Sequence, residues 1–327
     1  MIVKDRDPLL TPNGKKPSDR SIEEMLQAGV INLDKPSGPT SHQVTAWVRD
    51  IFSIDKIGHG GTLDPGVSGV LPVTLGRATR MTDLVLRSDK EYVCVMRLHR
   101  DVEPDKLREV IMSFEGDIFQ TPPVRAAVKR QTRIRRLHSI RILELQGRDV
   151  LFRVRCDAGT YVRTLCADVG EALGIGAHME DLRRIRSGAM EEKDSVTLQD
   201  LKDAYVSWKD GKGDWLRTMI WPMERLLEPF RRIVVKDSAV DALCHGADLA
   251  AAGIARLEEG ISKGETVAMF SLKGEAVALG IALASSDEMT RAREGLMVNT
   301  DRVFMDPGTY PKMWETSPRA PAEPQEE

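Results

Sequence analysis

One carboxylate stands alone in an unusual stretch of the chain. Residues 58–73 read GHGGTLDPGVSGVLPV, and Asp64 is the only acidic side chain among them. Because no second carboxylate lies nearby, the stretch does not fit the paired acids of glycoside hydrolases. The order Asp64-Pro65-Gly66 suits a type II turn. Taken by itself, this tripeptide favours a turn over a catalytic group.

Glycines crowd around this aspartate. Gly58, Gly60 and Gly61 precede it and Gly69 follows it, so the backbone here is predicted to lie close to something bulky. His59 stands five residues before Asp64. A lone histidine is more often a hydrogen-bonded structural residue than a catalyst, and that interpretation is retained for His59.

The composition is that of an ordinary core-forming protein. Of 327 residues, 41% are hydrophobic and 30% are charged, and no apolar run is long enough to predict a membrane span. The N-terminus has no signal-peptide core. The four cysteines are scattered without a metal-ligand spacing. We therefore expect reduced thiols in a cytosol-like compartment, no metal site and no membrane partner.

Positive charge is concentrated in one window. The net charge is −3, but residues 121–165 hold only three acids beside eleven basic residues. These basic residues are Arg125, Lys129, Arg130, Arg133, Arg135, Arg136, Arg141, Arg148, Arg153, Arg155 and Arg163. The densest part, VRAAVKRQTRIRR, has no clean amphipathic period. It is either a solvated charged loop or a basic loop that contacts phosphates, and composition does not choose between the two.

The elements that position these residues follow from hydrophobic periodicity. A short apolar strand at 31–34 runs into a Pro/Gly turn, and Thr40 or Ser41 caps the next helix. Strands are predicted at 90–99 and 147–156, and helices at 41–52, 104–116 and 159–174. The helix at 41–52 is expected to bury Val44, Trp47, Val48 and Ile51. The basic segment 178–188 receives no assignment. Without a regular β-α-β cadence, the pattern predicts an α+β domain with a largely antiparallel sheet.

A second unit begins near Pro229. Strands are predicted at 231–237 and 296–305, with a hairpin between them that turns at Lys273-Gly274. Short strands over about eighty residues favour a small β-barrel. The Pro-rich, acidic end is expected to be disordered. The predicted domains are an N-terminal extension at 1–30, a catalytic domain at 31–228, a β unit at 229–310 and a tail at 311–327.

Several motifs in order resemble one family. GHGGTLDPGVSGVLPV is similar to the catalytic-aspartate motif of the TruB/dyskerin pseudouridine synthases. The resemblance continues through INLDKPSGPTSHQV, KEYV, PPVRAAVKR, CDAGTYVRTL and GAHMEDLRRIRSG, and spans about residues 30–190. The C-terminal unit resembles a PUA domain, an RNA-binding fold. GHGGTLDPGVSGVLPV, PPVRAAVKR and GAHM look like the archaeal and eukaryotic H/ACA branch.

The resemblance implies isomerisation of uridine to pseudouridine in RNA. The N-glycosidic bond breaks, the uracil turns, and C5 rejoins C1′, so neither cofactor nor metal is expected. Asp64 matches the essential carboxylate, which acts as a nucleophile at C1′ or as a base at C2′. Arg163, in GTYVRTL, matches the arginine that orients this carboxylate and favours its charged form.

Four further positions match the family's substrate-binding residues. Tyr92 in KEYV matches the tyrosine that stacks on the target base, although a strand aromatic taken alone is more often core. Leu182 matches the residue that closes an apolar pocket. Lys35 contacts substrate or orders the DKPSG turn, and His59 binds RNA or its own loop.

The RNA and protein partners are implied by the same resemblance. Arg125, Lys129 and Arg130 correspond to the thumb loop that contacts substrate RNA. The expected partners are a guide RNA, substrate rRNA or tRNA, and small H/ACA core proteins, in the cytoplasm of an archaeal-type cell or in a nucleolus. The alternatives are a stand-alone synthase for the T-loop uridine of tRNA and a non-catalytic RNA-binding scaffold.

Overall fold

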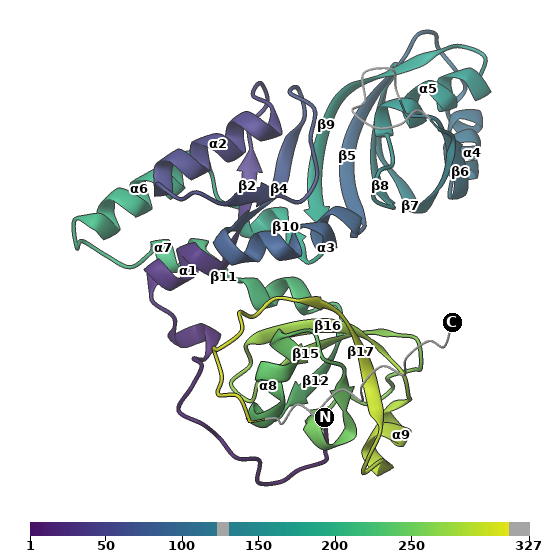
Figure 1. Cartoon of the computed structure of the whole chain (residues 1–327). Coiled ribbons are helices and arrows are strands. Elements are labelled where there is room, and N and C mark those ends of the chain that lie inside the picture. The colour runs from purple at the N-terminus through teal and green to yellow at the C-terminus, as the bar shows by residue number, and fades with distance from the viewer. Residues whose placement is uncertain (123–130, 314–327) are drawn as a thin grey trace, which may run out of the picture. The chain divides into compact units, whose positions relative to one another are not determined.

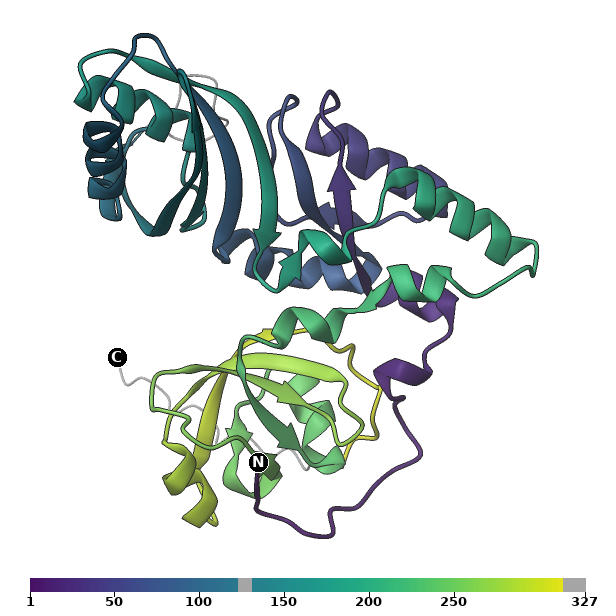
Figure 2. The same ribbon diagram turned by 180° about the vertical axis from the view of Figure 1, so that it is seen from behind.

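The structure is a computed structural model that describes residues 1–122 and 131–313. The chain divides into two compact units. One comprises Ser21–Leu226, and the other joins Met1–Arg20 to the residues from Leu227 onward. The first thirty residues, expected to form one extension, are thus divided between the units. The units are described separately below and are shown in Figures 1 and 2.

The larger unit is built on one ten-stranded sheet. Its main path runs β11-β2-β4-β9-β5-β8-β7-β6, with β3 beside β4 and β10 beside β9. Only β4 and β9 pair in parallel, so the predicted antiparallel α+β class is confirmed. The strands are β2 (Gly29–Lys35), β3 (Ile57–His59), β4 (Ser68–Leu75), β5 (Lys90–Leu98), β6 (Gly116–Gln120), β7 (Arg133–Gln146), β8 (Asp149–Cys156), β9 (Ala177–Ser187), β10 (Met190–Glu191) and β11 (Trp221–Pro222).

Helices of this unit cover the sheet in two groups. The helices are α1 (Ile22–Ala28), α2 (Ser41–Phe52), α3 (Thr82–Arg87), α4 (Pro104–Ser113), α5 (Val162–Ala172), α6 (Leu198–Lys209) and α7 (Leu216–Met219), with 3-10 turns at Gly76–Met81, Glu192–Asp194 and Met223–Leu227. Helices α4 and α5 pack over strands β5, β7 and β9, whereas α2 and α6 lie side by side near β2 (Figures 1 and 2). Each group covers its own apolar cluster.

Helix α2 shows how local sequence sets these elements. Of the two predicted caps, Thr40 is the N-cap, and it forms a capping box with Gln43. The buried face runs through Val44, Val48 and Phe52. Trp47, expected on that face, is 46% exposed. At about 100° per residue it lies about 100° from Val48, the centre of the buried face, so it points outward.

Strand β9 was not foreseen in the basic segment 178–188. Its charged residues hide the period-2 pattern, because only Leu182 and Arg184 are buried near its centre. The basic window also departs from the loop interpretation, since Arg133, Arg135 and Arg136 lie on β7. Several of its arginines pair with acids from outside the window. These pairs are Arg136–Asp117, Arg148–Asp101, Arg153–Glu91 and Arg155–Asp89.

The second unit is a seven-stranded sheet ordered β1-β14-β12-β15-β16-β17-β13 around its own apolar core. Its elements are β1 (Ile2–Val3), β12 (Arg231–Val235), β13 (Leu249–Ala250), β14 (Ile254–Leu257), β15 (Thr266–Phe270), β16 (Ala276–Ala282), β17 (Leu296–Val303), α8 (Asp237–Cys244) and α9 (Ser286–Arg291), with 3-10 turns at Pro17–Asp19 and Ala251–Gly253. The predicted hairpin joins β15 to β16, and Gly274 has the positive φ of its turn.

The N-terminal residues belong to this second unit. Strand β1 pairs with β14, and buried Asp237 accepts hydrogen bonds from the backbone N–H and the hydroxyl of Thr11. Of the predicted tail, residues 314–327 lie outside the described part of the chain. Within residues 1–122 and 131–313, no helix is long and apolar enough to cross a membrane.

Candidate active site

Asp64 stands at the first position of a tight turn. The backbone N–H of Val67 donates to the Asp64 carbonyl over 3.0 Å, and Pro65 and Gly66 occupy the centre of the turn. The predicted type II geometry is wrong, because it needs a positive φ at Gly66, which Gly66 does not have. Glycine at this position is therefore not demanded by the backbone conformation.

Most glycines around the turn lie close to other atoms of the protein, which a side chain at these positions would meet. A Cβ on Gly69 would lie 2.2 Å from the carbonyl oxygen of Arg184, and one on Gly61 would lie 3.4 Å from its guanidinium. Gly60 is pressed against Val85 in the same way. The bulky neighbour expected from the sequence is thus partly Arg184. Gly66 differs, since a Cβ there would meet nothing within 4 Å.

Arg163 reaches the carboxylate from helix α5. Its guanidinium donates to Asp64 Oδ2 over 2.5 Å. The two side chains are 54% and 55% exposed, respectively. A charge-assisted bond of this kind fixes the direction of the carboxylate. The structure thus joins two groups that are 99 residues apart in sequence and leaves both open to an incoming molecule.

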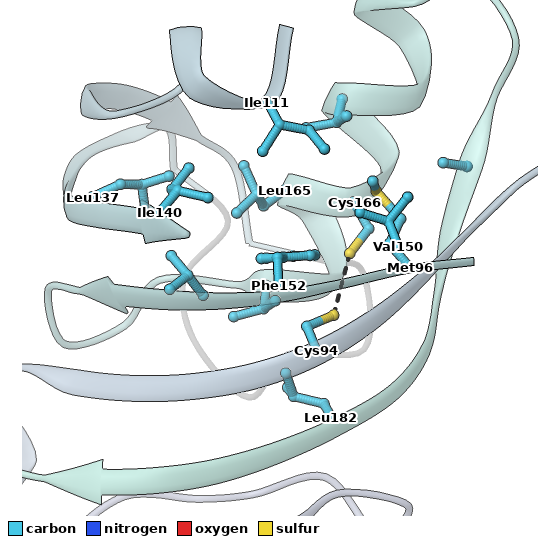
Figure 3. Close-up of a cluster of buried hydrophobic side chains, with 14 of the residues drawn as sticks. Cys94, Met96, Ile111, Leu137, Ile140, Val150, Phe152, Leu165, Cys166 and Leu182 are labelled. Carbon is cyan, nitrogen blue, oxygen red and sulfur yellow. Dashed lines mark hydrogen bonds between the residues drawn. The ribbon is translucent and has the colours of Figure 1, made fainter. Parts of the chain in front are cut away.

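One apolar cluster supports every element of this site. Leu63 and Val67 anchor the turn to it, Val162 anchors the start of α5, and Tyr92 and Leu182 pack on it from β5 and β9. Leu182 is only 8% exposed. In Figure 3 it lies beside Cys94, whose sulfur faces that of Cys166 on α5 at 3.6 Å. Because these elements share one packed core, they hold Asp64 and Arg163 in register.

Tyr92 lies on β5, and its nearest charged neighbour is Arg184 on β9. It pairs with Arg184 across β5 and β9, and its hydroxyl contacts the Arg184 guanidinium. Burial raises the pKa of the Tyr92 hydroxyl, and the Arg184 cation opposes that rise. The Tyr92 hydroxyl therefore stays neutral near pH 7, as a hydrogen-bonding group in the floor of the site.

Lys35 holds the turn from below. Its ammonium group donates to the carbonyls of Pro36, Pro65 and Val67, and the residue is fully buried. Burial lowers the pKa of Lys35, and the positive charge of Arg184 lowers it further. The negative charge of Asp64 opposes both effects. Three backbone acceptors use the three N–H donors of the ammonium group. These contacts support the turn-ordering interpretation of Lys35 over direct substrate binding.

His59 lies behind the turn at the end of β3. Its ring meets the His42 ring edge to face at 4.9 Å. Its Nδ1 atom is buried and has no hydrogen-bond partner within the described residues. Burial lowers the pKa of His59, and the neighbouring His42 and Arg184 add to this effect. The neutral ring thus keeps one nitrogen inside the fold without a hydrogen bond.

Two buried cations near the site were missed in the sequence. Arg184 is 1% exposed. Lys90 donates to the carbonyls of Val85, Leu86 and Ser88 at the end of α3. Burial lowers the pKa of Lys90 to about 7. Basic neighbours in the sequence concealed Arg184, and its only signal was the two-residue spacing from Leu182 on one strand. Lys90 stands between Asp89 and Glu91, as in an ordinary charged surface segment.

The predicted thumb-loop residues Arg125, Lys129 and Arg130 lie outside the described residues. Strands β6 and β7 border this segment, and the hydroxyls of Thr121 and Thr132 meet at 2.8 Å beside it. Within the described ranges, no group of three or more His, Cys, Asp or Glu side chains is placed to hold a metal ion.

Family models match almost the whole chain. The model for the TruB family pseudouridylate synthase N-terminal domain matches residues 49–162, which contain Asp64 and Tyr92. The chain belongs to the TruB family of pseudouridine synthases. The tRNA pseudouridylate synthase B C-terminal domain matches residues 163–228, the PUA domain matches 231–304, and the DKCLD domain matches 1–45. The resemblance inferred from the motifs is confirmed.

Individual TruB-family relatives cover nearly the full length. A protein of Methanopyrus kandleri named "Probable tRNA pseudouridine synthase B" is 57% identical, over 92% of this chain and 89% of its own length. A chain in an H/ACA RNP bound to a substrate RNA containing 2′-deoxyuridine is 49% identical, with a TM-score of 0.87 and 96% of each chain covered. A chain in a Cbf5–Nop10–Gar1 complex is 51% identical, with a TM-score of 0.87 and 95% of each chain covered.

This TruB-family member is therefore an RNA pseudouridine synthase. The reaction it catalyses is an isomerisation of uridine, in which the bond from the sugar to the base changes from nitrogen to carbon. A carboxylate held by an arginine above an apolar floor suits that chemistry. The exposed carboxylate is accessible from outside the fold, and the residues beneath it are apolar.

Proposed function

We propose that this synthase is the catalytic subunit of an H/ACA ribonucleoprotein, in which a guide RNA selects the target uridine in rRNA or tRNA. The proposal is supported by full-length similarity to chains of two H/ACA-type assemblies. The observation that carries the catalytic part is the contact between Asp64 and Arg163, both half exposed.

Asp64 is the catalytic carboxylate in this proposal. It attacks C1′ as a nucleophile or removes a proton at C2′ as a base, and either step needs the ionised form. Arg163 supplies the matching positive charge at 2.5 Å. Because Asp64 lies at the exposed edge of a turn, a flipped-out nucleotide reaches it without any opening of the fold.

Tyr92 and Leu182 form the floor beneath the base. Tyr92 packs on the same apolar cluster as Leu182 and offers a ring face to a stacked uracil. We also assign to His59 a polar contact with RNA, through a ring atom other than its buried Nδ1. Lys35 acts indirectly, by holding the turn that carries Asp64.

RNA is held by surfaces outside this centre. We assign the chemistry to residues 31–228 and guide binding to the PUA unit at 229–310. Arg125, Lys129 and Arg130 contact phosphates of the substrate, an interaction that weakens with salt and carries no sequence preference. Small H/ACA core proteins complete the particle, by analogy with the Cbf5–Nop10–Gar1 complex. The similarity to an M. kandleri protein supports a cytoplasmic, archaeal-type setting.

A second candidate is stand-alone modification of tRNA. It is favoured by one observation, the name "Probable tRNA pseudouridine synthase B" carried by a 57% identical relative. A non-catalytic scaffold is disfavoured, because a scaffold does not require Asp64 and Arg163 to remain paired.

Pseudouridine mapping distinguishes these functions. Transcribed tRNA and rRNA fragments are incubated with the purified protein alone, and then with a guide RNA and the core proteins. Modification that appears only in the full mixture supports the guided subunit. Modification of tRNA by the lone protein establishes stand-alone activity. RNA binding without product in either mixture would contradict both catalytic functions and support the scaffold.

A further inference from the structure

Arg184 occupies an unusual position for a cation. Its side chain is among the largest that are fully buried, with 1% exposure. No carboxylate pairs with it within the part of the chain that the structure describes. Burial lowers its pKa, and the contact with Tyr92 opposes that change. Burying an unpaired charge costs several kcal/mol, so this arginine needs contacts that use its donors well.

Those contacts all belong to the frame of the active site. Arg184 Nε donates to the carbonyl of Val70 over 2.7 Å, and Nη2 donates to the carbonyl of Gly61 over 3.0 Å. These two residues enclose the Asp64 turn, one on each side in the sequence. The same guanidinium contacts the hydroxyl of Tyr92. The Arg184 side chain therefore links the residues on both sides of the Asp64 turn to Tyr92.

The backbone of the loop is shaped around this arginine. Gly61 has φ +124° and Gly69 has φ +104°, and both positions face Arg184 at distances that leave no room for a larger residue at Gly69. Strand β9 begins its pairing with β4 here, at Ser68–Arg183 and Gly69–Arg184. Two glycines thus bring the loop into contact with both the side chain and the backbone of Arg184.

We infer that Arg184 is a positioning residue for the isomerisation, which sets the distance between the Asp64 carboxylate and the Tyr92 ring. The inference rests on the roles proposed above for Asp64 and Tyr92. Arg184 does not touch substrate, because it is buried beneath the loop. Its planar fork meets two carbonyls and a hydroxyl at once, a geometry that a lysine ammonium does not reproduce.

A double-mutant cycle tests the inference. Single-turnover rates and RNA affinities are measured for the parent, Arg184→Lys, Tyr92→Phe and the double variant. We expect Arg184→Lys to lower the rate about tenfold to hundredfold, because a displacement near 1 Å has that effect, while RNA affinity is retained. If Arg184 acts through the Tyr92 hydroxyl, Arg184→Lys lowers the rate by a smaller factor in the Tyr92→Phe background than in the parent.

Controls separate positioning from folding. Arg186→Met removes a paired arginine from the same strand, one whose partners are Asp89 and Glu91. We expect its rate to stay within about twofold of the parent. Circular-dichroism melting identifies variants that do not fold. If Arg184→Lys is too unstable, Arg184→Gln takes its place in the cycle.

Two results would overturn the inference. One is a folded Arg184 variant whose rate matches that of the parent. The other is a loss of rate that is equal in both tyrosine backgrounds and accompanied by an equal loss of RNA affinity. An Asp64→Asn variant is included in the same series. If Asp64→Asn keeps its turnover, the proposed catalytic function fails; if it is inactive while Arg184→Lys is fully active, only the positioning role fails.

Discussion

At the scale of single residues, the proposed catalytic group is a carboxylate that is exposed but held by an arginine. Replacing Asp64 by Asn keeps the turn, because Pro65, Gly66 and the Val67 N–H bond remain. We predict that Asp64→Asn abolishes pseudouridine formation and changes RNA affinity little, since the lost group acts only on the sugar. Pseudouridine mapping and a filter-binding titration measure the two effects. Turnover of Asp64→Asn at the parent rate would show that the Asp64 carboxylate is not the catalytic group.

The arginine partner gives a graded prediction at the same scale. Arg163→Lys keeps a positive charge near Asp64 but loses the planar fork. We expect a rate below that of the parent and above that of Arg163→Met, because charge and orientation each contribute to holding the carboxylate. Both variants should melt close to the parent, within about 1 kcal/mol, because an exposed ion pair adds little stability. Equal rates for Arg163→Lys and Arg163→Met would show that the positive charge at this position does not contribute to catalysis.

At the scale of elements, the segment from 58 to 69, which joins β3 to β4, is shaped by what its glycines contact. Gly69 has φ +104° and abuts the Arg184 backbone, whereas Gly66 lacks a positive φ and faces open space. We predict that Gly69→Ala destabilises the larger unit by more than about 2 kcal/mol, from backbone strain and overlap together. Gly66→Ala should lie within about 1 kcal/mol of the parent, because it also restricts the unfolded chain.

Thermal melting of the two glycine variants, each beside the parent, compares them directly. Similar melting temperatures would mean that the loop adapts around Arg184 without strain. A large destabilisation in Gly66→Ala alone would mean that the turn needs glycine for a reason other than the contacts seen here. The pair is well matched, because both changes add one methyl group and the two positions are close in sequence, Gly66 in the turn and Gly69 near the start of β4.

At the scale of the whole molecule, RNA affinity depends on charge that is unevenly distributed. Much of the basic window is already paired with acids on the sheet, as in Arg153–Glu91 and Arg155–Asp89. Changing Arg125, Lys129 and Arg130 together to Ala should weaken RNA binding and reduce the slope of log K against log salt by about 2, the value for three single-strand phosphate contacts. Affinity is measured over a salt series. An unchanged slope would assign these residues to a solvated loop.

The sequence by itself determined the chemistry and most of the local structure. The ordered motifs identified the family. A helix cap at Thr40 or Ser41 and the hairpin at Gly274 followed from residue types alone. Such signals are local, because caps and turns depend on neighbours within four residues. They failed where packing decides, as for Trp47, which lies outside the buried face of α2, and for strand β9, whose charges concealed its period.

Only the tertiary structure decided how the site is held together. The contact between Asp64 and Arg163 joins residues 99 positions apart, and the grip of Arg184 on Gly61 and Val70 spans more than one hundred positions. No local pattern reports such contacts, because they arise when separate strands and a helix bury one shared apolar cluster. The sequence motif therefore supplied the carboxylate, and the packed sheet determined which cations lie around it.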